Sequence, residues 1–284
     1  MVTFSDVFYV YSPKTPMQFE ALHDVNLSIK DGSFTAIVGR TGSGKSTLVQ
    51  HINALLEPTS GYVEVNGFRN EHHKKHKGKE TNELRRQVGL VFQFPENQLF
   101  EETVEKDVAF APKNYGDDEK TALKKAHIAL KKVGLGEEFY GRSPFELSGG
   151  EKRRVAIAGV LAFHPSILVV DEPTAGLDPE GAEMMMELFK KVNEEGTTVI
   201  LVTHDMNLVL AYADEVVVME NGKVAEVTTP QELFSQDLEK YSLELPLLYR
   251  LIFDLNQKGA NLDPKSIKSL DDFAKAIAER RKER

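Results

Sequence analysis

Short apolar runs alternate along this chain with segments that have helical periodicity. The apolar runs are bounded by turn residues, as β-strands are, and cover residues 2–10, 22–29, 34–38, 62–65, 88–92, 167–170, 197–202 and 216–219. Helices are predicted over residues 45–56, 180–195 and 206–213. This alternation predicts an α/β fold with a largely parallel core sheet. The first two strands and residues 62–65 are expected to form a separate antiparallel β layer.

The strand pattern is interrupted between residues 103 and 162, where helical patterns dominate. We therefore expect one domain over residues 1–229, with a helical subdomain at about 94–162 inserted in it. Residues 230–284 form a small C-terminal helical extension. Its last helix carries Leu270, Phe273, Ala274 and Ile277 on one face. That apolar face must pack on something, either on its own chain or on a partner protein.

Composition narrows the class of protein. Acidic residues outnumber basic residues 44 to 35, giving a net charge of -9, and the 284-residue chain has no cysteine. This charge balance disfavours binding to nucleic acid, and the lack of cysteine excludes disulfides and Cys-ligated metals. No apolar stretch approaches the roughly 20 residues of a membrane span, and no secretory leader is expected. Any membrane role is therefore expected to depend on a partner.

A glycine-rich segment between a predicted strand and a predicted helix carries the strongest chemical signal. It matches the phosphate-binding P-loop pattern and comprises Gly39, Arg40, Thr41, Gly42, Ser43, Gly44, Lys45, Ser46 and Thr47. Its backbone N–H groups and the helix N-terminus would bind phosphate oxygens. Lys45 would contact the β- and γ-phosphates, and the Ser46 hydroxyl would ligate Mg²⁺. A glycine turn that matches by chance is disfavoured by the flanking strand and helix.

Two acidic residues follow the apolar run at residues 167–170. They lie where a buried strand emerges at the carboxyl edge of the sheet, which is where ligands bind in open α/β folds. Asp171 is expected to hold Mg²⁺, directly or through water. Glu172 is expected to orient or deprotonate the water that attacks the γ-phosphate. Adjacent acids after a strand are commonly only solvated, but the P-loop favours the catalytic interpretation.

A second phosphate-binding helix start is predicted upstream of this acidic pair. Ser148, Gly149 and Gly150 lie in the segment LSGGE, just before a helix that runs to residue 162. Because the chain already has a complete P-loop, the simplest explanation is that this second site serves the nucleotide of another subunit.

The segment LSGGE, followed by a strand that ends in Asp-Glu, resembles the ATPase subunits of ABC transporters. The resemblance covers residues 11–204 and implies an ATPase that couples hydrolysis to transport. It implies that Gln93 touches Mg²⁺ and couples to a membrane subunit, and that Gly176–Asp178 form the D-loop. It also implies that His204 contacts the γ-phosphate and that Tyr11 stacks on adenine.

Two longer segments resemble more closely the ATPases of energy-coupling factor transporters. PENQLFEETV at 95–104 and SGGEKRRVAIAGVLA at 148–162 look like the second of the two paired ATPases. This resemblance implies a paralogous ATPase partner, a transmembrane coupling subunit and, indirectly, small membrane-embedded substrate-binding subunits. It further implies uptake of vitamins or transition-metal ions, with the chain peripheral on the cytoplasmic side of the cell membrane. The C-terminal extension would serve ATPase pairing.

The sequence disfavours several other classes of nucleotide-binding protein. A chromosome-maintenance ATPase would carry a long coiled coil between the P-loop and LSGGE, and a translation ATPase usually carries two cassettes. A pure binding module would be expected to lack Glu172 or His204. The ATPase of a conventional ABC importer or exporter stays open, since it would differ in partner and not in chemistry. The basic, His-rich run at residues 72–79 is interpreted as a solvated loop, with a metal site as the alternative.

Overall fold

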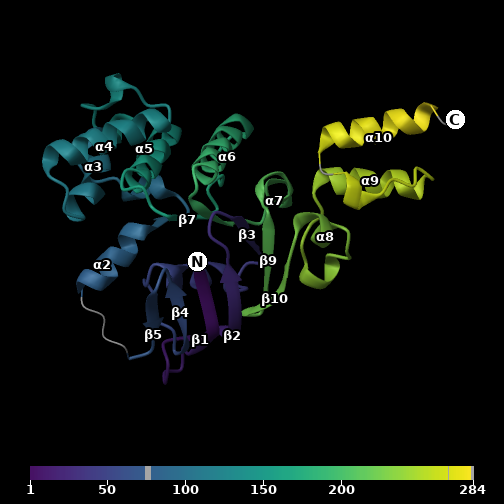
Figure 1. The fold of residues 1–284 in the computed structure, drawn as a ribbon, viewed down its shortest axis with the longest axis horizontal. Helices are drawn as coiled ribbons and strands as arrows, with labels where there is room; N and C mark the ends of the chain where they lie inside the picture. Colours follow the sequence, from purple (N-terminus) through teal and green to yellow (C-terminus); the bar gives the residue numbers. More distant parts are fainter. Residues whose placement is uncertain (74–77, 268, 283–284) are drawn as a thin grey trace.

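Two β-sheets form the centre of the computed structural model, which describes residues 1–73, 78–267 and 269–282 (Figure 1). The first is antiparallel, with strand order β2-β1-β4-β5. Its strands are β1 (Val2–Tyr11), β2 (Phe19–Ile29), β4 (Ser60–Val65) and β5 (Phe68–Glu71). The separate antiparallel layer is therefore confirmed. Strand β5 was not predicted, because its short polar sequence FRNE lacks an apolar alternation.

The second sheet has six strands in the order β10-β9-β3-β8-β7-β6. Its strands are β3 (Phe34–Val38), β6 (Val88–Val91), β7 (Ile167–Asp171), β8 (Thr198–Val202), β9 (Glu215–Glu220) and β10 (Lys223–Thr228). All neighbours pair in parallel except β9 and β10, which form an antiparallel hairpin at one edge. The largely parallel core sheet is thus confirmed, and the edge strand β10 is an addition to the prediction.

The helices pack around these sheets. They are α1 (Lys45–Ile52), α2 (Gly78–Gln87), α3 (Val104–Asn114), α4 (Glu119–Lys132), α5 (Gly149–Leu161), α6 (Pro179–Glu194), α7 (Met206–Tyr212), α8 (Pro230–Phe234), α9 (Leu247–Gln257) and α10 (Leu270–Lys282). A short 3₁₀ turn, η1 (Pro95–Gln98), follows β6. Within the described part of the chain, every helix is too short or too polar to serve as a membrane span.

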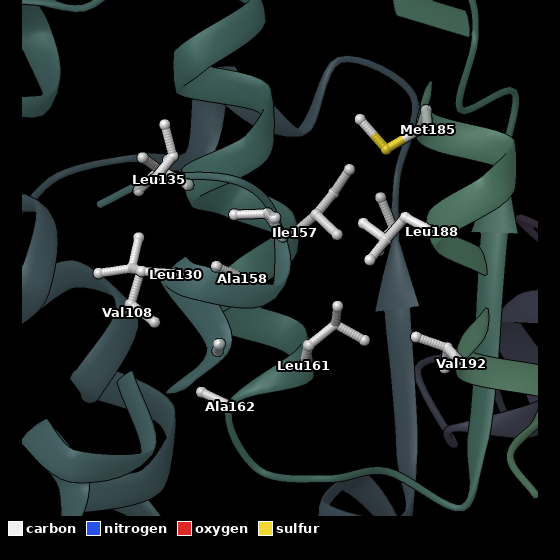
Figure 2. Close-up of a cluster of buried hydrophobic side chains, with 14 of the residues drawn as sticks. Val108, Leu130, Leu135, Ile157, Ala158, Leu161, Ala162, Met185, Leu188 and Val192 are labelled. Carbon is white, nitrogen blue, oxygen red and sulfur yellow. The ribbon is translucent and has the colours of Figure 1, made fainter. Parts of the chain in front are cut away.

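Helix α5 joins the helical region to the parallel sheet. Figure 2 shows Ile157 and Leu161 of α5 directed toward Leu188 of α6, while Ala158 faces Leu130 of α4. These side chains are nearly inaccessible to solvent and belong to one continuous apolar cluster. Because both sides of α5 are buried, the polar residues at its N-terminal end are held in a fixed position relative to the sheet.

Helix α1 lies between the two sheets. Leu48 and Ile52 are fully buried and share a cluster with Val2 of the antiparallel sheet and with Ile37 and Val202 of the parallel sheet. Burial of an apolar side chain stabilises the fold by about 1.5–3 kcal/mol. The helix that follows the P-loop is therefore anchored on both sides, which positions the loop at the carboxyl edge of the parallel sheet.

The C-terminal extension packs partly on the main domain. Phe234 of α8 and Tyr249 of α9 are fully buried with Val216 and Val218 of β9. A smaller cluster joins α9 to α10, where Phe273 is partly buried. The apolar face of α10 therefore packs at least in part on its own chain. The division of the chain at residue 229 stays a prediction. In Figure 1, α9 and α10 lie on the opposite side of the molecule from α3 and α4.

Candidate active site

The P-loop connects β3 to α1, and its glycines are required by close backbone contacts. Gly39 has a φ of 146°, and a Cβ there would lie 2.2 Å from the carbonyl oxygen of Met219. Gly44 has a φ of 102°, and a Cβ there would lie 2.7 Å from the carbonyl oxygen of Ala21. Any larger residue would meet both a strained backbone and a steric clash. The tight turn that the motif predicts is therefore present.

The amine of Lys45 lies over this turn. Its Nζ donates hydrogen bonds to the carbonyl oxygens of Gly39 at 2.7 Å and Arg40 at 3.0 Å. Burial lowers the pKa of this amine, while the nearby carboxylates of Glu172 and Asp171 act in the opposite direction. The amine is thus a partly desolvated charge, so its interaction with a phosphate would be stronger than that of an exposed lysine.

Asp171 ends β7 beside the P-loop helix. Burial raises the pKa of its carboxyl group, and a hydrogen bond with Ser46 opposes that shift. The Ser46 hydroxyl and the Asp171 carboxylate are therefore neighbours, although 124 positions lie between them in the numbering of the chain. Both offer hard oxygen ligands of the kind that Mg²⁺ prefers.

Glu172 and His204 form a pair at the same edge. The Nδ1 of His204 and the Oε1 of Glu172 are 2.7 Å apart, and the carboxylate is 16% exposed against 78% for the imidazole. The backbone of Glu172 has a φ of 49°, and its N–H donates to the carbonyl oxygen of Val202 at 2.9 Å. A non-glycine residue in this conformation is strained, and such strain is concentrated at functional sites.

A cavity of about 420 Å³ brings most of the predicted residues together. Its walls are formed by Phe19, Ala21, Thr41, Gly42, Gly44, Lys45, Ser46, Thr47, Gln93, Asp171, Glu172 and His204. The cavity therefore holds a cation, two carboxylates and a histidine beside a phosphate-binding loop. Ser46, Gln93 and Asp171 present oxygen donors to it, so the residues fit a bound Mg²⁺. Gly39, Arg40 and Ser43 belong to the loop but do not form its walls.

Phe19 and Ala21 line the cavity although neither was predicted from the sequence, whereas Tyr11, which was predicted, is not among the lining residues. The Tyr11 hydroxyl instead shares a hydrogen bond of 3.2 Å with the Thr47 hydroxyl. Tyr11 and Phe19 are directly paired across β1 and β2, so their side chains are neighbours on one face. Phe19 is 58% exposed at the cavity. The predicted strand began at residue 22, and an earlier start would have drawn attention to Phe19.

Ser148, Gly149 and Gly150 lie at the start of α5 and not around this cavity. Ser148 is the N-cap: its hydroxyl accepts from the N–H of Glu151, and the Glu151 carboxylate accepts from the N–H of Ser148. A Cβ at either glycine would meet open space, so the segment presents its backbone to the surface. This separation agrees with the hypothesis that the segment serves another subunit.

The His-rich run lies elsewhere, after β5. Ligand atoms of Glu57, His72 and His73 lie within 4.8 Å of one another, and all three residues are exposed. The Nδ1 of His72 is 3.3 Å from the Glu57 carboxylate. The positions 74–77 of this run lie outside the described residues. Gly78 and Lys79 of the run lie in α2 and not in a loop, while a solvated turn accounts for the exposed contacts of His72 and His73 with Glu57.

The sequence of this chain is similar to those of known transporter proteins. The ABC transporter family pattern matches residues 22–175, from β2 through the acidic pair to Ala175. The energy-coupling factor transporter ATP-binding protein EcfA2 of Ligilactobacillus salivarius is 53% identical, covering 95% of both chains. The protein of the same name from Spiroplasma kunkelii is 49% identical, covering 100% of this chain and 93% of its own length.

Solved structures agree in fold. CbiO1 from Clostridium perfringens, part of the ABC transporter complex cbiONQ, is 39% identical with a TM-score of 0.73, covering 89% of this chain and 98% of its own. The ATP-binding cassette MJ0796, in a dimeric post-hydrolysis structure bound to ADP and Pi, is 34% identical with a TM-score of 0.72. The match covers 81% of this chain and 99% of the MJ0796 chain. The α/β ATPase fold is therefore confirmed. This chain belongs to the ABC transporter family, in its group of energy-coupling factor transporter ATP-binding proteins.

Proposed function

We propose that this chain binds ATP and Mg²⁺ between its own P-loop and the LSGGE segment of a partner ATPase, and hydrolyses the ATP to power uptake of a micronutrient across the cell membrane. The observation that carries this proposal is the cavity in which Lys45, Asp171, Glu172 and His204 converge on the P-loop. This chain's own LSGGE segment lies on another surface, where it would face the nucleotide of the partner.

The P-loop and its neighbours would hold the triphosphate. Backbone N–H groups at the start of α1 and the Lys45 amine would bind phosphate oxygens. Ser46, Gln93 and Asp171 would hold Mg²⁺, which neutralises charge on the phosphates when it is bound. Tyr11 was expected to stack on the adenine ring, but Phe19, its neighbour across β1 and β2, is the aromatic residue that lines the cavity, so we propose that Phe19 stacks on the base.

Glu172 would act as the base for hydrolysis. Its carboxylate would orient the attacking water and accept its proton, while His204 holds the γ-phosphate and, by its bond to Oε1, orients that carboxylate. The strained backbone of Glu172 fits such a role, because strain persists only where the surrounding structure over-determines it.

A second ATPase would complete the site. The N–H groups of its LSGGE segment would approach the γ-phosphate and exclude water. The MJ0796 cassette supports this arrangement, since it is dimeric and holds ADP and Pi. By the resemblance to the paired energy-coupling factor ATPases, we propose a paralogous partner and a heterodimer.

The proposed membrane partners are inferred from the names of the related proteins. Their name, energy-coupling factor transporter ATP-binding protein, and the cbiONQ complex of the CbiO1 neighbour support a transmembrane coupling subunit. Small membrane-embedded subunits would select a vitamin or a transition-metal ion. The chain would then be peripheral on the cytoplasmic side of the membrane, with η1 and the exposed Phe94 and Phe100 facing the coupling subunit.

The substitution Glu172→Gln tests the chemistry. ATP binding should be retained, while turnover should fall about 10²–10⁴-fold, because the amide cannot accept the proton of water. The matched control is Glu137→Gln, which alters a 79% exposed carboxylate away from the cavity. If the Glu172 variant turned over ATP as fast as the control, Glu172 would not be the catalytic base.

Purification of the tagged chain from membranes in mild detergent tests the assembly. A second ATPase, a helical coupling subunit and small membrane proteins in the same complex are expected. A homodimer with two conventional permease subunits would contradict the energy-coupling factor assembly while leaving the ATPase chemistry intact.

A further inference from the structure

Arg153 is a buried cation on the second turn of α5, four residues beyond the first residue of that helix. Its side chain is 4% exposed and makes four hydrogen bonds. Nε and Nη2 donate to the two carboxylate oxygens of Glu96 at 3.0 and 2.8 Å. Nη1 donates to the carbonyl oxygens of Ala175 at 2.7 Å and Pro173 at 3.4 Å. The planar guanidinium therefore binds two separate segments at once.

The first of these segments follows Gln93. Glu96 lies in η1, and its side chain is 19% exposed. Burial acts to raise the pKa of Glu96, but the hydrogen bonds and charge of Arg153 outweigh it and hold that pKa below the usual range. Glu96 is therefore a carboxylate paired with Arg153. The ring of Phe94 lies 5.7 Å from the guanidinium carbon, so this segment contacts Arg153 through two side chains.

The second segment follows Glu172. Pro173 and Ala175 carry the carbonyl groups that accept from Arg153, and Asp178 then caps α6 through the N–H of Gly181 at 2.7 Å. No regular strand or helix spans the residues between Glu172 and α6. Hydrogen bonds from Arg153 thus hold the backbone segment that directly follows Glu172.

We propose that Arg153 is a positioning residue that couples the surface around Gln93 and η1 to the segment carrying Glu172, so that docking of a membrane partner on η1 changes the rate of ATP hydrolysis. This inference rests on the proposed function. Movement of Glu96 draws the guanidinium with it, because the bidentate pair is held in a buried site. The same guanidinium is hydrogen-bonded to the carbonyl oxygens of Pro173 and Ala175. A shift of the guanidinium would therefore move the backbone next to Glu172.

Two conservative variants test this role, one at each end of the Arg153–Glu96 pair, and the melting temperature reports the cost of altering a buried pair. Arg153→Lys keeps the charge but cannot bind Glu96 and the two carbonyl groups together. Glu96→Gln keeps the shape of its side chain and removes the charge. The matched control is Arg69→Lys, because Arg69 also pairs with a carboxylate, that of Glu71, but is 44% exposed on β5.

The measurement uses the complete complex purified from membranes and the ATPase pair released from it. For each, kcat and KM for ATP are determined, together with the melting temperature. Arg153→Lys and Glu96→Gln should each lower the stimulation of kcat by the membrane subunits about two- to thirtyfold, with KM for ATP changed less than about twofold. The double variant should be no worse than the more affected single variant, since both break one connection.

Unchanged stimulation in both variants would overturn the proposal, as would a loss that follows only the melting temperature and ATP binding. If Arg153→Lys fails to fold, Glu96→Gln decides the question by the same criteria. Failure of the proposed function is distinguishable, because the wild-type complex would then hydrolyse no ATP. That outcome would overturn both inferences.

Discussion

His51 shows how a single buried residue supports the active site. It lies in α1, is fully buried, and its Nδ1 lies 2.7 Å from the carbonyl oxygen of Thr47 in the P-loop segment. Its Nε2 has no hydrogen-bond partner in the described structure. A neutral ring with the proton on Nδ1 satisfies the first contact. Burial lowers the pKa of His51 from 6.5 to about 4, against the smaller effect of the Thr47 bond.

This shift predicts a loss of stability in acid. Because the unfolded state takes up the proton at 6.5 and the folded state only at about 4, the stabilisation is complete above pH 6.5 and is lost as pH falls to about 4. The loss attributable to His51 is about 3 kcal/mol. The free energy of unfolding, measured by chemical denaturation between pH 7 and 4, should therefore decline less for His51→Gln than for wild type. His164→Gln, which alters an exposed histidine, should decline as wild type does. Equal declines in all three proteins would contradict the assignment.

Phe19 is expected to set the affinity for the base of the nucleotide. Phe19→Ala should weaken ATP binding by about 1–3 kcal/mol, or roughly five- to 150-fold in Kd, because the stacking surface is lost. Inorganic tripolyphosphate competes with ATP for the phosphate subsite but has no base. Its own Kd, measured by this competition, should be the same in Phe19→Ala and wild type. A parallel loss of tripolyphosphate binding would show that Phe19 supports the P-loop and does not contact the base.

Helix α5 contributes to three parts of the structure. Its N-terminal end displays the LSGGE segment, Arg153 holds the segments near Gln93 and Glu172, and its apolar side chains fill the core on both sides (Figure 2). The sequence predicted a helix in this region and the importance of its first residues. It did not predict the contacts of Arg153, because charged side chains on helices are usually solvated.

Truncation of Ile157 tests how far the fold depends on this helix. Ile157→Ala should lower the free energy of unfolding by about 2–5 kcal/mol, because it removes buried methyl groups and leaves a cavity. Ile128→Ala on α4 removes the same atoms from a side chain that is 49% exposed and should change stability by about 0.5 kcal/mol or less. The comparison is made by denaturant unfolding, and similar losses for both variants would refute the central position of α5.

The C-terminal extension presents apolar side chains to the surface of the molecule. Leu247, Leu251 and Leu270 are 73%, 40% and 70% exposed and border a cavity of about 610 Å³ lined by residues of α7, α9 and the start of α10. Clustered exposed apolar residues are typical of interaction surfaces. This agrees with the expectation that the extension serves pairing of the ATPases, which stays a prediction.

The double substitution Leu247→Asp and Leu270→Asp should therefore weaken the ATPase pair. Because both side chains are exposed, the melting temperature of the chain should change little, while the dissociation constant of the pair should rise at least about tenfold. Analytical ultracentrifugation of the purified pair measures this. Ile128→Asp is the control for an added charge on an exposed helix, and equal dissociation in both variants would contradict a pairing role.

Short motifs in the sequence were enough to predict an ATPase of the ABC family, because each motif is contiguous and lies in its own local strand or helix. The P-loop, the Asp171–Glu172 pair and the LSGGE segment were all predicted in this way, and the roles of their residues stay predictions. Which distant residues meet became clear only from the packing of the folded chain. Strand register brings Phe19, which lines the cavity, beside Tyr11, which does not, and packing of α5 brings Arg153 to Glu96 and Ala175. These contacts depend on how sheets and helices stack, and no periodicity along the chain encodes them locally.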